Sequence, residues 1–202
     1  MRQPSGPWSA FLWRFVPLLV AVLCPWPGLA RGFSGAFAGV CNAFAGVDLG
    51  WDAEVRFVPH ASAEHPWWVL LSVTNVLTGQ HFSIPVDTRT AAYIRLAVFV
   101  ALAVALPIWK TRRGLQAVGV GFAILVAVCA LTVAMPLLQI LGMVHVLALG
   151  VRTQSALSIG ILTLLSYPSM AFAIPGLVWL LTMRLAAAPG DAPVRLSRVA
   201  AR

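Results

Sequence analysis

The chain has 202 residues, of which 60% are hydrophobic and only 10% are charged. An average soluble domain carries roughly a quarter charged residues, so this composition argues against a water-soluble fold and favours a chain matched to a lipid bilayer. The formal charge of +8 would suit nucleic-acid binding, but the basic residues cluster beside apolar blocks, as in cytoplasmic loops of membrane proteins, so no nucleic-acid partner is expected.

The apolar blocks predict a mainly α, integral membrane protein with about four transmembrane helices and a small extracytoplasmic three-stranded β segment between helices one and two. The expected segments are a first transmembrane helix (1–31), an extracytoplasmic helix and β segment (32–90), a second transmembrane helix (91–109), a basic cytoplasmic loop (110–114), a third transmembrane helix (115–138), an interfacial connection (139–156), a fourth transmembrane helix (157–184) and a basic cytoplasmic tail (185–202).

The first apolar block is Phe11–Ala30, about 20 residues and so about 30 Å as a helix. Pro17, Pro25 and Pro27 are expected to bend or end this helix. A cleaved signal peptide is the alternative, because a positively charged region precedes the block and small residues close it. We favour a retained helix, since the charged region is long and Trp26 suits an interfacial anchor.

A helix is expected next, over residues 32 to 46, where the motif Ala-Phe-Ala-Gly-Val occurs twice. The seven-residue period keeps Phe37 and Phe44 on one helix face. We expect this helix to lie along the membrane or just outside it. Its glycines would also let another helix approach closely.

Three strands are predicted after this helix. Apolar and polar residues alternate over Val47–Phe57, which places an apolar row on one face of a strand. A second strand is expected over Trp68–Val76, and a turn at Thr78–Gly79 leads into a third, Gln80–Val86. The membrane surface or the preceding helix is expected to cover the apolar face.

Charge gives the orientation of the second transmembrane helix, Ala91–Trp109. Residues 31 to 90 hold three basic and five acidic residues, a net charge of −2, whereas a basic cluster, 110–113, follows the helix. The positive-inside rule therefore places the β segment outside and both termini in the cytoplasm.

Two long apolar helices are expected in the C-terminal half, Leu115–Leu138 and Leu157–Met183. Pro168 and Pro175 are one heptad apart in the second of them and should bend it toward one side. The connection, residues 139–156, is too apolar for an ordinary loop. It is expected to extend the third helix or to lie in the membrane interface.

Cys24, Cys41 and Cys129 form no Cys-x-x-Cys pair, so redox and zinc-ribbon spacings are absent. Cys24 and Cys129 lie inside apolar stretches and have no nearby basic partner that would activate a thiolate. We expect these two to pack as small hydrophobic residues. Cys41 could face a non-cytoplasmic compartment, without an obvious disulfide partner.

Five residues of the external segment carry metal-binding side chains: His60, Glu64, His65, His81 and Asp87. Imidazole and carboxylate groups are standard metal ligands, but this spacing matches no known zinc signature. We therefore expect solvated histidines and no bound metal or cofactor.

Arg95 lies about one turn inside the second transmembrane helix, where a cation is unfavourable unless it reaches the interface or finds a partner. Asp87 is the nearest acidic residue in sequence, so an ion pair of Arg95 with Asp87 or a loop carboxylate is the favoured interpretation. In the alternative, these residues contact a partner, such as an anionic peptide terminus, or a lipid headgroup.

The layout resembles a known family in its broken first helix, its Gly/Ala-rich helix, the β segment ending in Gly79-Gln80-His81-Phe82, and the second helix ending at Pro107-Ile108-Trp109 before a basic cluster. It is similar to the exosortase H-associated membrane proteins of Gram-negative bacteria. The resemblance implies an inner-membrane partner of an exosortase, the polytopic cysteine protease-transpeptidase that processes C-terminal sorting tails of exported proteins. No nucleophile motif of the Glu-Ala-Cys-Ser-Gly type is present, so the enzyme role is not carried over.

The leading hypothesis is a non-catalytic inner-membrane accessory protein whose external β segment contacts an exosortase or an exported substrate. A small transporter or channel subunit is the second hypothesis, although polar groups within the apolar blocks are scarce apart from Arg95. A membrane enzyme that uses His60, His65 or His81 is the third.

Overall fold

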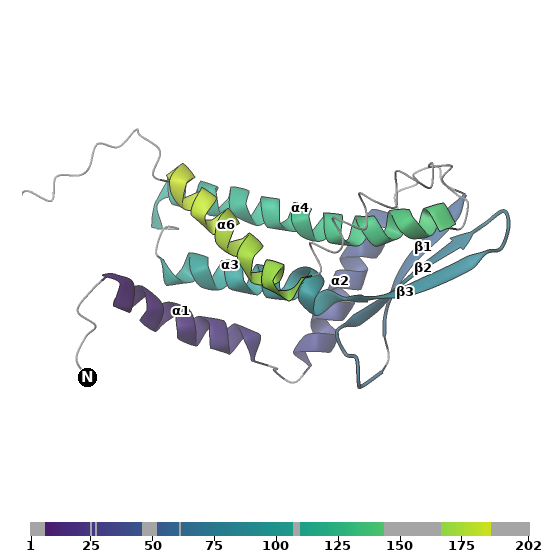
Figure 1. Ribbon diagram of the computed structural model, residues 1–202, viewed down its shortest axis with the longest axis horizontal. Coiled ribbons are helices and arrows are strands. Elements are labelled where there is room, and N and C mark those ends of the chain that lie inside the picture. Colours follow the sequence, from purple (N-terminus) through teal and green to yellow (C-terminus); the bar gives the residue numbers. More distant parts are fainter. Residues whose placement is uncertain are drawn as a thin grey trace, which may run out of the picture.

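The computed structural model describes residues 7–24, 26, 28–45, 52–60, 62–106, 110–143 and 167–186. Figure 1 shows a bundle of helices that lie side by side, another helix that crosses one end of this bundle, and a small sheet that projects beyond it. The bundle helices are α1 (Pro7–Leu23), α3 (Ile94–Ala105), α4 (Arg112–Met143) and α6 (Pro168–Ala186), the crossing helix is α2 (Leu29–Ala45), and the strands are β1 (Ala53–Pro59), β2 (Trp68–Asn75) and β3 (His81–Asp87).

The first helix, α1, ends at Leu23 and not near Ala30, in agreement with the expectation that its prolines bend or end it. The physical reason is Pro25, because the residue before a proline is disfavoured in the helical conformation. Gly28 then adopts a φ of 77°, which suits glycine, and the chain turns into α2.

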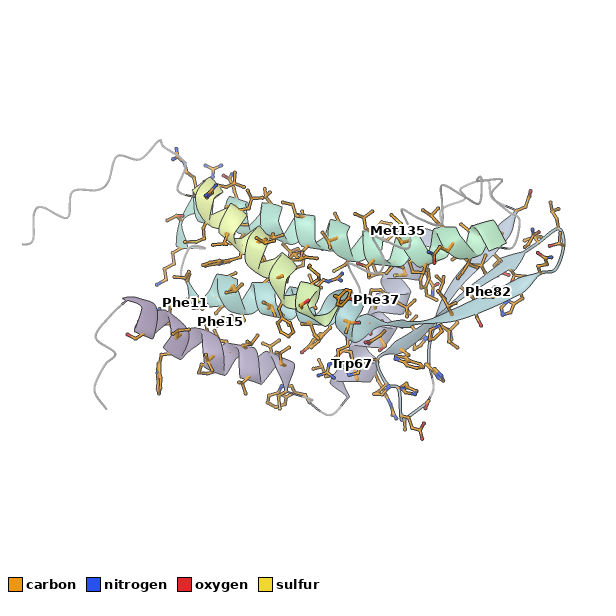
Figure 2. The ribbon with its side chains drawn as sticks, viewed as in Figure 1. Phe11, Phe15, Phe37, Trp67, Phe82 and Met135 are labelled. Carbon is orange, nitrogen blue, oxygen red and sulfur yellow. The ribbon has the colours of Figure 1, made fainter. Side chains whose placement is uncertain are left out.

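Aromatic contacts tie α1 to the rest of the bundle. Phe11 stacks on Phe15 one turn further along α1, with ring centroids 5.5 Å apart, and on Trp179 of α6 at 6.2 Å (Figure 2). At the other end of α1, the Tyr93 hydroxyl donates a hydrogen bond to the carbonyl of Val22. The helix is therefore held at both ends.

The predicted three-stranded sheet is confirmed, with strand order β1-β2-β3 and antiparallel pairing throughout. Buried and half-buried residues alternate along β2, so one face of the sheet points into the protein. Gly79, with a φ of 70°, belongs to the turn between β2 and β3. The part of the first predicted strand before Trp51, like Trp51 itself, lies outside the described residues.

Two helices cover the inner face of the sheet. Ala38 of α2 and Ile140 and Leu141 of α4 join Leu71 and Val73 of β2 in one buried core. The expectation that the α2 helix covers the apolar face is confirmed. The contribution of α4 was not expected, because Ile140 and Leu141 belong to the predicted 139–156 connection, which was not assigned to the core of the sheet.

The second bundle helix begins earlier than expected, with a π-helical turn, η1 (Arg89–Tyr93), that continues directly into α3. Asp87 stabilises this start, since its Oδ1 accepts a hydrogen bond from the Arg89 N–H at 2.9 Å and its Oδ2 accepts one from the Thr90 hydroxyl at 3.0 Å. Residues 107–109, the expected end of the second transmembrane helix, lie outside the described part of the chain.

The longest helix is α4, with 32 residues. It begins at Arg112, so part of the basic loop expected at 110–114 is helical. It runs on to Met143, which confirms that the start of the 139–156 connection extends the third predicted helix. At 1.5 Å per residue its length is about 48 Å, more than the roughly 30 Å of a bilayer's hydrocarbon core.

The last described helix, α6, starts at Pro168, so this proline opens the helix and does not bend it. Proline is favoured at the first helical position, because an N–H at that position has no carbonyl partner within the helix and proline lacks one. Pro175 lies inside the helix and is buried. Residues 157–166 and the tail from residue 187 are outside the described ranges.

Helices α3, α4 and α6 meet at a glycine. A β-carbon on Gly121 of α4 would lie 2.3 Å from Cγ2 of Thr182 and 2.8 Å from Cζ of Phe99. Only a residue without a side chain fits at this distance. Phe99 also packs with Leu125 and Val178 in a second buried cluster.

Of the described helices, α4 and α6 are long and apolar enough to cross a membrane. Helix α1 contributes a shorter apolar helix, Ser9–Leu23, and α3 has 12 residues. Length and composition therefore support two of the four expected transmembrane helices, since a span needs about 20 residues.

Candidate functional site

A cavity of about 590 Å³ lies where α2, β1, α3 and α4 meet. Its walls come from Phe33–Ala45 of α2, Ala53–Phe57 of β1 and Val126–Leu137 of α4, with Ala92 and Leu96 on a further side. None of the described side chains that line it is charged, and only two cysteine thiols among them can form hydrogen bonds. The volume falls within the roughly 300–1,000 Å³ typical of ligand pockets. A water molecule would find few polar partners there.

A fully buried arginine stands beside this cavity. Arg95 of α3 has 0% of its surface exposed and lies between the lining residues Ala92 and Leu96 in sequence. Its Nη1 donates hydrogen bonds to the Ala91 carbonyl at 2.9 Å and to the Thr132 hydroxyl at 2.7 Å. The second bond joins α3 to α4, so the cation helps to hold the bundle together.

The predicted ion pair between Arg95 and Asp87 is wrong. The Asp87 carboxylate instead accepts hydrogen bonds from Arg89 and Thr90 at the start of η1. Among the described residues the ion pair is between Arg56 and Glu54 on β1. The alternative, a contact of Arg95 and Asp87 with a partner or a headgroup, stays a prediction.

Two of the three cysteines line the cavity. Cys129 lies beside the Arg95 guanidinium, so the expectation that it has no basic neighbour was wrong; the two are far apart in sequence and meet only through helix packing. Burial raises the pKa of the Cys41 thiol to about 11, so this thiol stays protonated at neutral pH. Cys24 is exposed on the described chain, whereas we expected it to be packed.

The histidines His60, His65 and His81 occupy opposite ends of the sheet. His65 stacks on Trp68 with ring centroids 3.7 Å apart, and His60 lies on the same tryptophan at 6.1 Å. His81 instead contacts the Thr74 hydroxyl, six residues along β2 from Trp68, or about 20 Å at 3.3 Å per residue. In the described part of the chain no three His, Cys, Asp or Glu side chains are grouped so that they could hold a metal.

The outer face of the sheet points away from α2 and α4. Val58, Leu70 and Pro85 align across the three strands in the middle of this face, and Val58 is 49% exposed. The stacked Trp68 borders them, and polar residues follow toward the hairpin that projects in Figure 1. We call Val58, Trp68, Leu70 and Pro85 the outer patch. The described helices α2 and α4 share their buried core with the inner face of the sheet.

One side chain of α2 closes the free edge of β1. The Asn42 amide donates to the Phe57 carbonyl at 2.8 Å, and its Oδ1 accepts from the Phe57 N–H at 2.7 Å. These two bonds imitate the pairing of a neighbouring strand. Asn42 therefore blocks part of an edge to which another strand could add. Sequence reasoning missed this residue, because a single asparagine in a helix carries no signal for such a contact.

No family model, curated protein or solved structure matches this chain. The cavity, the buried arginine and the outer patch are therefore interpreted from their own chemistry.

Proposed function

We propose that this chain is an integral membrane protein of the bacterial inner membrane with four spanning helices, namely α1, α3 with η1, α4 and α6. In the most apolar 18-residue stretch of α4, only 28% is buried within the chain. A core helix of a soluble protein would be mostly buried, so the open apolar surface of α4 favours lipid as its surroundings. Of the shorter helices, α3 packs against α6 and α4, and α1 packs against α3, which supports a common span.

The two ends of the bundle support the orientation. Lys110, Arg112 and Arg113 lie at the start of α4, and Arg184 lies in the last turn of α6, at the end of the bundle opposite the sheet (Figure 1). Basic residues concentrate on the cytoplasmic side of membrane proteins. In this proposal the sheet is extracytoplasmic and both termini are cytoplasmic.

Within that membrane the protein acts as a non-catalytic accessory protein in an exosortase-type system for protein sorting or processing. The observation that carries this proposal is the outer patch. The inner face of the sheet is anchored on two helices, whereas on the outer face Val58 and Pro85 are exposed and the other two patch residues are half-buried. An exposed apolar patch bordered by polar residues is typical of a protein contact site. The partner is a membrane-bound exosortase or its exported substrate.

Site-specific photo-crosslinking tests this function. A photoreactive amino acid at Val58 in the outer patch, at native expression, should crosslink to a membrane-bound exosortase or to a protein with a C-terminal sorting tail. Val104 of α3 is the matched control, because it is 48% exposed and belongs to a bundle helix far from the outer patch. Crosslinks of equal yield at both positions, or none at Val58, would contradict the proposal.

The other two hypotheses draw no support from the described residues. Arg95 is enclosed by protein and bonded to Thr132, so it does not line an open transport path. His81 is too far from His60 and His65 to share a reaction centre with them.

A further inference from the structure

The mouth of the apolar cavity is itself apolar. Val40 and Phe44 of α2 and Val126 of α4 line the cavity, yet they are 57%, 75% and 46% exposed. Large hydrophobic side chains around an opening are unfavourable in water and favourable in lipid. The cavity is thus continuous with the exposed apolar surface of α4, which includes Val120 and Phe122.

The position of the cavity along α4 gives its depth in the proposed membrane. Counted from Arg112 at 1.5 Å per residue, Val126 lies at about 21 Å and Leu137 at about 38 Å. A hydrocarbon core is about 30 Å thick, so the cavity spans the boundary between the outer-leaflet chains and their headgroups. Chains of outer-leaflet lipids lie directly beside its mouth.

The size of the cavity selects the kind of occupant. A helix of roughly 10 Å diameter occupies roughly 850 Å³ over two turns, more than the cavity can enclose. A partner helix therefore does not fit, whereas a single hydrocarbon chain does. The absence of charged groups among the described lining residues excludes recognition of a headgroup inside the cavity.

We propose that this cavity binds one acyl chain of a phospholipid from the outer leaflet of the bilayer. The inference rests on the membrane placement proposed above, but it does not require a protein partner. The bound chain fills the space between α2, β1 and α4, and so it supports the inner face of the sheet through contacts with side chains such as Phe37 and Val55.

Photoreactive lipid tests this proposal. The full chain is reconstituted in nanodiscs of phosphatidylethanolamine and phosphatidylglycerol that contain a phospholipid with a diazirine in its acyl chain, and the adducts are mapped by mass spectrometry. Adducts should concentrate on the cavity residues of α2 and α4. Ala130→Phe, which fills the cavity from α4, should remove most of them, while Ala127→Phe should not, because Ala127 is an exposed residue of α4 outside the cavity lining.

Ala36→Phe fills the cavity from α2 and serves as a second variant if Ala130→Phe does not fold. Equal labelling of cavity residues and of Val120 or Phe122, or full labelling in both filled variants, would overturn the acyl-chain site. A chain that fails to enter nanodiscs at all would instead overturn the membrane placement, so the two failures are distinguishable.

Discussion

At the scale of single residues, Arg95 shows how a bundle with few polar groups accommodates a cation. A buried guanidinium is strongly unfavourable unless its donors meet acceptors. Two of these acceptors are the Ala91 carbonyl, one turn earlier in the same helix, and the Thr132 hydroxyl of α4. The Thr132 hydroxyl donates in turn to the Val128 carbonyl at 2.9 Å, so its orientation is set for accepting from Arg95.

Thr132→Val tests this bond. The substitution keeps the volume but removes an acceptor of a buried charged donor, and we expect a loss of about 1–2 kcal/mol of stability. Thr182→Val is the matched control, because the buried Thr182 hydroxyl donates to the Trp179 carbonyl of its own helix at 2.7 Å and not to a charged group. Thermal unfolding in detergent should show a larger drop for Thr132→Val. Equal drops would contradict the role of Thr132.

Cys41 offers a pH-dependent prediction at the same scale. Since burial raises its pKa to about 11 from the ordinary 9.0, at pH 8 the folded chain holds about 100-fold less Cys41 thiolate than the unfolded chain. In a Cys24→Ala, Cys129→Ala background, maleimide labelling should be slow when folded and should rise about tenfold per pH unit up to pH 10. Denaturation in SDS should abolish the difference. A plateau above pH 9 in the folded chain would show that the thiol is not buried.

At the scale of elements, the edge of β1 depends on α2. An exposed strand edge invites pairing with other chains, and Asn42 satisfies both backbone groups of Phe57 at this edge. The Phe57 stretch of this edge is therefore closed to pairing with another strand.

Asn42→Ala should lower the free energy of unfolding by about 1–2 kcal/mol, since it leaves the N–H and the carbonyl of Phe57 without their side-chain partners. The Phe57 amide should then exchange with deuterium faster in the folded protein. Asn42→Asp keeps the acceptor for the Phe57 N–H and should preserve much of the protection. Unchanged exchange in Asn42→Ala would show that the side chain does not close the edge.

Helix packing at Gly121 is a second test at the element scale. In Gly121→Ala the new β-carbon would clash with Thr182 and Phe99. We expect this overpacking to lower the free energy of unfolding by about 1–3 kcal/mol. Gly119→Ala is the matched control on the same helix, because no atom lies within 4 Å of the added β-carbon. Alanine has a higher helix propensity than glycine, so the free energy of unfolding should stay unchanged or rise by up to about 1 kcal/mol. Unfolding midpoints in detergent compare the two. Similar values would contradict the close contact of α3, α4 and α6.

At the scale of the whole molecule, the length of α4 links the bundle and the sheet. Because this helix is longer than a hydrocarbon core, its far end would leave the bilayer in the proposed placement, and there it packs Ile140 and Leu141 under the sheet. The bundle and the sheet therefore share one continuous helix, which holds the outer patch at a set distance from the bundle.

Cysteine accessibility checks this topology. In a cysteine-free background, Ala63→Cys near the sheet should react with an impermeant maleimide in intact spheroplasts. Lys110→Cys, before α4, should react only after the membrane is opened, because both residues are exposed but on opposite sides. Labelling of position 110 in intact spheroplasts would reverse the proposed orientation or exclude it.

Local patterns in the sequence were sufficient to predict α2 and the three strands. The alternation over Val47–Phe57 and the repeat containing Phe37 and Phe44 have the periods of a strand and a helix, which depend on neighbouring residues only. The ends of helices were predicted less well. Pro25 was one of three prolines expected to bend or end the first helix, so its end was not fixed to one position, and Pro168 was expected to bend a helix that it instead begins.

The amino-acid sequence alone determined that the chain is mainly helical, strongly apolar and equipped with a three-stranded sheet, because composition and periodicity are properties of the chain itself. Only the tertiary structure decided which distant residues meet: Arg95 with Thr132 and Cys129, and Asn42 with Phe57. Asp87, the nearest acid in sequence, was the wrong partner for Arg95. Packing of helices and strands selects partners by distance in space, for which separation along the chain is no guide.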